Sequence, residues 1–211
     1  TAIMFVGCGS SDISEGVAKN DYPITINGVT LNSQPTGVAV LSQNIADVIL
    51  TGGFEATLKA KSEDCTQEDL SILPNLTIDD AQEMKSLGVT LVLVDEAPTE
   101  QQTAALQAQG IQVLAISPAK SRDDCKRLYR EVGSAIVGGN TGYTKGEKAC
   151  DNVFYTLDDI TRLVPSTGTQ YSACYLYDLE GHAATGNSLF GSLISYAGFF
   201  NSFGNELNNE I

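Results

Sequence analysis

The stretch GYTKGEKACDNVFYTLDDITRLVP, residues 142–165, determines how the rest of this sequence is interpreted. Thr144 and Glu147 have the spacing of a helix capping box, and Pro165 marks an end. Between them an apolar stripe recurs at helical spacing, formed by Ala149, Val153, Leu157, Ile160 and Val164. The pattern predicts one helix of about 20 residues, a rod of roughly 30 Å, which is long for a connection within one α/β domain.

On the N-terminal side of this helix, short apolar runs alternate with helical patterns. ITINGVTL (24–31) predicts a hairpin around Asn27-Gly28. Strands are then predicted at 37–41, 90–94 and 111–116, and helices at 42–53, 79–88, 99–110 and 121–139. Strands that alternate with helices of this length predict β/α crossovers and a parallel sheet.

On the C-terminal side, a Ser/Thr/Gly turn at 166–169 precedes a second start. YSACYLYD (171–178) predicts a strand and SLFGSLISYAGFFN (188–201) a helix. The fold class is therefore α/β, with an N-terminal lobe at 22–139, a backbone helix at 140–165 and the beginning of a second lobe at 166–211. One strand and one helix cannot bury a core of their own, so we expect the sequence to be clipped at its C-terminus.

Residues 1–21 have a different composition from the rest. Phe5-Val6-Gly7-Cys8 follows an apolar run and resembles the lipobox of bacterial lipoproteins, in which the cysteine carries the lipid. A Ser/Gly/Asp-rich stretch up to residue 21 then has the composition of a tether. This interpretation implies a chain clipped at its front and anchored through Cys8. The alternative is a disordered tail with an incidental cysteine.

Composition excludes several classes of function. The 211 residues include 12 basic and 26 acidic ones, a net charge of −14, which argues against nucleic-acid binding. With one histidine and no C-x-x-C, no zinc pattern forms, and G-x-S-x-G, P-loop and G-x-G-x-x-G motifs are missing. Whether the other cysteines are free or disulfide-bonded stays open; they are Cys65, Cys125, Cys150 and Cys174.

The order of lobe, single long helix and lobe resembles the helical-backbone (class III) substrate-binding proteins of ABC importers. Four segments contribute to the resemblance: GVAVLSQNIADVILTGGFEATLKAKS, ILPNLTIDDAQEMKSLGVTLVLVDE, IQVLAISPA and YLYDLEGHAATGNSLFGSLISYAGFFN. Together they cover roughly residues 24–205. Val89-Thr90 departs from the family, which usually has Pro-Asp there.

The resemblance implies a binding protein, with no enzymatic activity and no cofactor of its own. It would capture an iron-siderophore, haem or cobalamin between the lobes, outside the cytoplasm, and deliver it to an ABC permease and its ATPase. The ligand would bring any iron or cobalt, and we expect no separate metal site. Parallel sheets bind ligands in loops that follow their strands. The candidate ligand-binding residues are Ser42, Gln43, Asn44, Asp95, Glu96, Ser117, His182, Thr185, Gly186 and Asn187.

Several of these residues have a second explanation. Ser42 is also a helix cap, and a lone loop His182 is also a solvated surface residue. Tyr177, which is not in this set, is either a core residue or a stacking surface, and we favour the core interpretation. No basic triplet faces these loops, so an anionic ferric siderophore lacks an arginine clamp.

Family members dock to the permease through acidic residues, and Gln82 stands at that position here. Asp80 or Glu83 would substitute, although acidic residues are also common where a helix starts. Two other functions remain as alternatives: a surface lipoprotein for sensing or adhesion, and an enzyme on a doubly wound α/β fold.

Overall fold

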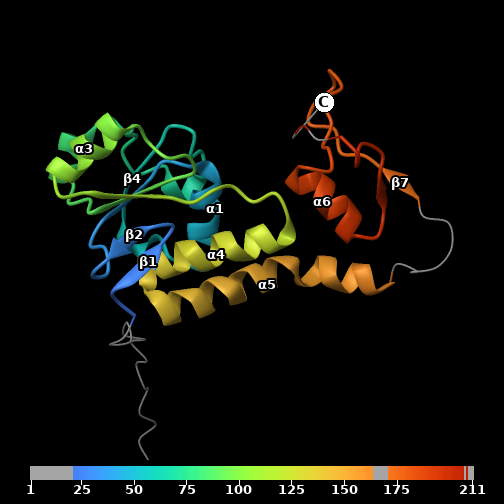
Figure 1. Cartoon of the computed structure of the whole chain (residues 1–211), viewed down its shortest axis with the longest axis horizontal. Helices are drawn as coiled ribbons and strands as arrows, with labels where there is room; N and C mark the ends of the chain where they lie inside the picture. The colour runs from blue at the N-terminus through green and yellow to red at the C-terminus, as the bar shows by residue number, and fades with distance from the viewer. Residues whose placement is uncertain (1–20, 164–170, 207, 209–211) are drawn as a thin grey trace, which may run out of the picture.

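A computed structural model describes residues 21–163, 171–206 and 208. An N-terminal α/β lobe rests on two long helices, α4 (Arg122–Val137) and α5 (Gly139–Leu163), which pack along each other. Helix α5 continues past α4 to a smaller C-terminal part (Figure 1). Residues 1–20 of the predicted lipobox and tether (1–21) and the turn at 166–169 lie outside the described residues, as do residues 164 and 165 of the predicted helix. Asp21, the last residue assigned to the tether, is 1% exposed and so belongs to the folded lobe.

The predicted parallel sheet is confirmed. Strands β3 (Val38–Val40), β4 (Leu58–Lys61), β5 (Leu91–Val94) and β6 (Gln112–Ala115) are all parallel and lie in the order β4-β3-β5-β6. The predicted hairpin is present as β1 (Ile24–Ile26) and β2 (Val29–Leu31). Its turn residues Asn27 and Gly28 have φ angles of 48° and 81°, the left-handed conformation that this dipeptide favours.

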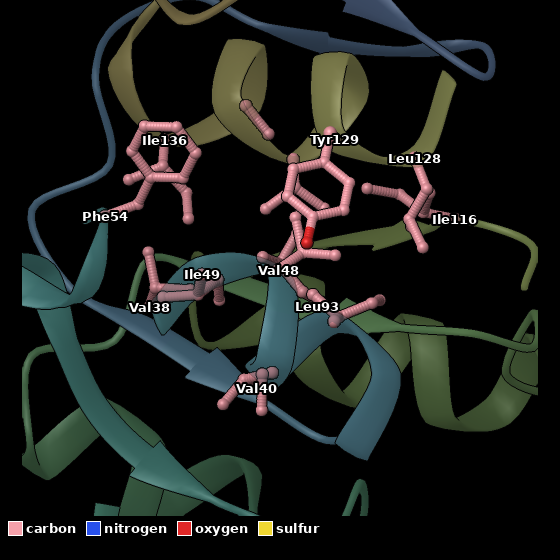
Figure 2. Close-up of a cluster of buried hydrophobic side chains, with 14 of the residues drawn as sticks. Val38, Val40, Val48, Ile49, Phe54, Leu93, Ile116, Leu128, Tyr129 and Ile136 are labelled. Atoms are coloured by element: carbon pink, nitrogen blue, oxygen red, sulfur yellow. The ribbon is translucent and has the colours of Figure 1, made fainter. Parts of the chain in front are cut away.

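Alternate residues of a strand point to opposite faces of the sheet, and here both faces carry apolar residues. Helices cover both faces and bury these side chains in two cores. Val38, Val40, Leu91 and Leu93 belong to one core with α1 (Gln43–Gly52) and α4. Figure 2 shows this cluster, to which the sheet, α1 and α4 contribute side chains. Ala39, Val92 and Val94 belong to the other core, with α2 (Ala81–Ser86) and α3 (Glu100–Ala108). Two single-turn helices complete the lobe, η1 (Glu55–Thr57) and η2 (Glu68–Leu70).

The backbone helix begins at Gly139, one residue before the predicted segment 140–165, so the Thr144/Glu147 capping box predicted for its start is wrong. Thr144 lies inside α5 and its hydroxyl donates to the Asn140 carbonyl at 3.0 Å, while Glu147 pairs with Arg130. The cap comes from Asp21, whose carboxylate accepts from the backbone N–H groups of Asn140 (2.7 Å) and Thr141 (3.0 Å).

The predicted apolar stripe of α5 is confirmed only in part, by Ala149 and Leu157, which pack against the core. Val153 and Ile160 are about half exposed, whereas Gly142, Gly146, Cys150 and Phe154 form the buried face. Two glycines allow the backbones of α4 and α5 to approach closely. A Cβ on Gly142 would lie 2.0 Å from the Gly133 carbonyl oxygen, and one on Gly146 would lie 2.1 Å from that of Tyr129.

The C-terminal part has less regular structure than predicted. Strand β7 covers only Ser172–Ala173 and pairs in parallel with β8 (Phe200–Asn201), which the sequence did not indicate. The predicted helix is present as α6 (Leu189–Tyr196), capped by Ser188. No helix in the described ranges is both long and apolar enough to cross a membrane. Cys65, Cys125, Cys150 and Cys174 are free thiols.

Candidate functional site

A pocket of about 440 Å³ lies at the carboxyl ends of β3, β4 and β5. The connection from β3 leads to β4 on one side of the sheet, whereas the connection from β5 leads to β6 on the opposite side. The order of the strands therefore reverses between the neighbours β3 and β5. Open parallel sheets bind ligands outside their strands at such a switch point. We call this site the carboxyl-edge pocket; its lining residues are Leu41, Ser62, Glu63, Asp64, Leu76, Thr77, Ile78, Val94, Asp95, Glu96, Pro98 and Gln102.

Local structure fixes one wall of the carboxyl-edge pocket. Thr99 and Gln102 form the predicted capping box at the start of α3, and the Gln102 amide also donates to Asp79 at 3.0 Å. Asp80 accepts from the Thr77 N–H at 2.6 Å and from its hydroxyl at 2.7 Å. Those two bonds hold the pKa of Asp80 below its usual value. The loop 77–80 and the first turn of α3 are thereby joined beside the pocket.

Of the ten candidate ligand-binding residues, the structure places Asp95 and Glu96 in the pocket lining. Ser42 lies next to the lining residue Leu41, but its buried hydroxyl accepts from the Ile45 N–H at 3.4 Å as the cap of α1. Gln43 and Asn44 are exposed on the first turn of that helix, and Ser117 is exposed after β6.

The four candidate residues of the C-terminal part are not in the pocket lining, which comes from the N-terminal lobe. Thr185 is fully buried, and its hydroxyl bonds to the Asn208 carbonyl, so the predicted ligand contact by this side chain is not available in this structure. Gly186 packs closely, since a Cβ there would lie 2.0 Å from the Gly204 carbonyl oxygen. His182 and Asn187 are exposed.

His182 is hydrogen-bonded through Nδ1 to one carboxylate oxygen of Asp178, and the other oxygen accepts from the backbone N–H groups of residues 180–182. The imidazole lowers the pKa of the Asp178 carboxyl. With Glu180 these side chains form the one group in the described residues whose ligand atoms are close enough to share a metal ion. All three are exposed.

Beside this loop lie three exposed aromatic rings. Tyr175 stacks on Phe190 with ring centroids 4.2 Å apart, and Tyr177 meets both rings edge-on. Tyr177 is 41% exposed, so its favoured interpretation as a core residue is wrong, and the alternative of an exposed aromatic surface fits its place among these rings.

The signal that sequence reasoning missed is the pair Glu63-Asp64. It follows β4, a strand that is not among those predicted from the sequence for this lobe, and so belongs to the loops in which a ligand is expected. Extending the rule for strand ends to β4 would have found it. The permease-docking candidates Asp80 and Glu83 lie at the start of α2, close in sequence to the lining residues Thr77 and Ile78. Their docking role stays a prediction.

No protein-family model matches the sequence, and no curated protein matches it. Solved structures do. The haem-binding protein RhuT from Roseiflexus aligns with a TM-score of 0.60 and 21% identity, over 85% of this chain and 70% of that one. The vitamin B12-binding protein BtuF of Vibrio cholerae has a TM-score of 0.60, 14% identity and coverages of 84% and 69%. An ABC transporter substrate-binding protein from Listeria monocytogenes has a TM-score of 0.58 and 12% identity, over 85% of this chain and 69% of that one.

These likenesses show the fold. The chain has the class III substrate-binding fold of ABC importers, with a parallel four-stranded sheet and a long helix, as the sequence predicts. All three structures are described as binding proteins.

Proposed function

We propose that this chain captures a metal-chelate solute outside the cytoplasm and delivers it to an ABC permease. The observation that carries the proposal is the position of the carboxyl-edge pocket, at the switch point of a parallel sheet in the class III fold. Its volume lies in the range of sites for small organic ligands. Haem and vitamin B12 are the ligands of two proteins with this fold, and both are metal chelates.

The extracytoplasmic location is part of the proposal. The haem- and B12-binding proteins are both described as periplasmic. The lipid anchor rests on the motif Phe5-Val6-Gly7-Cys8 alone. Mass spectrometry of the protein purified from its native membrane would test it, because a lipid on Cys8 adds a defined mass to the N-terminal peptide. An unmodified Cys8 in membrane-extracted protein would remove the anchor from the proposal.

Binding is tested by titrating the protein calorimetrically with haem, cobalamin and a ferric hydroxamate siderophore. We expect one of them to bind with a dissociation constant of about 1 μM or lower. Replacing the half-buried lining residue Ile78 by tryptophan (Ile78→Trp) should fill the pocket and weaken that binding about tenfold or more.

The matched control is Ile72→Trp, because Ile72 is 90% exposed and does not line the pocket. It should leave the dissociation constant unchanged. If none of the three chelates binds, or if both tryptophan variants bind equally well, the proposed function at this pocket is wrong.

A further inference from the structure

We infer that the carboxyl-edge pocket selects a ligand that carries positive charge on an apolar body and rejects anionic ligands. The inference rests on the proposed function and gives that site a substrate class. The site itself is defined by its cavity and by its position at the switch point of the sheet. The charged groups that surround the cavity then decide which ligands are attracted to it.

Two kinds of side chain in the lining bear on the choice of ligand. Leu41, Leu76, Ile78 and Val94 supply apolar surface, against which the body of an organic ligand can be desolvated. The lining also includes four acidic residues, in two adjacent pairs on different loops: Glu63 with Asp64, and Asp95 with Glu96. Two acidic pairs that face one cavity focus a negative potential into it, which raises the local concentration of cations and opposes anions.

The cations near the pocket do not offset these carboxylates. Lys61 precedes the lining residue Ser62, but it is buried and its ammonium donates to Asn75 at 2.7 Å. It would balance one of four negative charges. Lys120 follows β6 at the same edge of the sheet and is not a lining residue.

Every arginine of the sequence is engaged elsewhere in an ion pair. The pairs are Arg122–Asp158, Arg127–Glu131, Arg130–Glu147 and Arg162–Asp159. All four arginines lie on α4 or α5, away from the pocket lining. The printed sequence has no lysine or arginine after Arg162, so the C-terminal part within it adds none either. An anionic ligand would therefore meet four carboxylates without the bidentate partner that carboxylate recognition uses.

The test uses two ions of the same shape and opposite charge. Tetraphenylphosphonium and tetraphenylborate each place one charge inside a shell of four phenyl rings. Calorimetric titration of the whole chain should detect binding of the phosphonium and none of the borate. Because the attraction is electrostatic, the phosphonium affinity should fall as salt is added.

A matched pair of double variants distinguishes the effect of the lining carboxylates on binding from the effect of the overall charge of −14. Glu63→Gln with Asp64→Asn removes two charges from the lining. Glu68→Gln with Asp69→Asn removes the same two residue types from exposed positions in η2, outside the lining. We expect the first variant to bind the phosphonium about tenfold more weakly, and the second to bind it as the unmodified chain does.

Equal binding of both ions, absence of phosphonium binding, or equal effects of the two double variants would each overturn the inference. The outcomes also distinguish it from the proposed function. If the chelate titrations succeed with an anionic chelate, the proposed function holds and the charge preference is wrong. If the phosphonium binds selectively and no chelate binds, the charge preference holds and the proposed function is wrong.

Discussion

The side chain of Asp21 holds the start of α5, although its bonding partner Asn140 lies 119 residues further along the chain. Asp21 is 1% exposed, and its backbone carbonyl also accepts from the Gly139 N–H at 2.8 Å. The first N–H groups of a helix have no partner within the helix, and a carboxylate there is favoured by the helix dipole as well. Asp21 therefore joins the start of the described chain to the helix that leads to the C-terminal part.

We expect Asp21→Ala to lower the free energy of unfolding by about 0.5–2 kcal/mol, the usual cost of removing a helix cap. Asp21→Asn keeps an oxygen acceptor and should lose less. Urea unfolding of both variants measures the difference. Asp69→Ala, at an exposed position of η2, is the control. Equal midpoints for Asp21→Ala and Asp69→Ala would show that the cap does not stabilise the fold.

At the scale of elements, the packing of α4 against α5 depends on glycine rather than on large apolar residues. The Cβ of an alanine at position 142 would overlap the Gly133 carbonyl, and both atoms belong to helices that cannot shift independently. Gly142→Ala should therefore cost about 1–3 kcal/mol through overpacking, even though alanine is the better helix former. Asn152→Ala, at an exposed position of the same helix, should be neutral or slightly stabilising. Thermal unfolding of the two variants compares them directly, and a stabilised Gly142→Ala would contradict close contact between the helices.

The sequence predicts those features that depend on local spacing, and it does not predict those that depend on contacts between distant segments. The cap of α1 by Ser42 and the capping box of α3 follow from local spacing, and both are present. The buried face of α5 does not follow from hydrophobic periodicity, because Gly142 and Gly146 contribute no apolar side chain to the pattern. The cap of α5 could not be located either, since Asp21 is distant in sequence.

The sequence likewise predicts the pocket residues that follow a clearly apolar strand and misses those that follow a strand interrupted by lysines. Asp95 and Glu96 were found because they directly follow a fully buried strand, whose end marks the edge of the sheet. Glu63 and Asp64 follow β4, whose exposed Lys59 and buried Lys61 interrupt the apolar run that would have marked a strand. The core interpretation of Tyr177 fails because this segment forms only an isolated bridge between Leu176 and Ala183 and leaves the ring exposed.

At the scale of the whole molecule, one cluster joins the C-terminal part to the two long helices. The Arg122 guanidinium donates to Asp158 of α5 and to the Tyr196 hydroxyl of α6, each at 2.6 Å, and that hydroxyl donates to Asp158 at 2.9 Å. Tyr196→Phe removes the hydroxyl from both charged partners, which should cost about 1.5–3 kcal/mol. Hydrogen exchange should become faster in α6 and stay unchanged in α1. Tyr155→Phe, at an exposed position of α5, is the control, and uniform changes across the chain in Tyr196→Phe would contradict a local junction.

This junction and the length of α5 limit how far the C-terminal part can move when a ligand binds. Helix α5 has 25 residues and is packed along α4, so it has the stiffness of a helix pair rather than of a flexible multi-strand hinge. We expect small movements on binding, and X-ray scattering in solution, with and without a bound chelate, measures them. The radius of gyration should stay nearly constant in the unmodified chain and respond more in Tyr196→Phe, where the junction is weakened. A decrease of several ångströms in the unmodified chain would show that the two parts close like a clamshell, and the long helix would then have to bend.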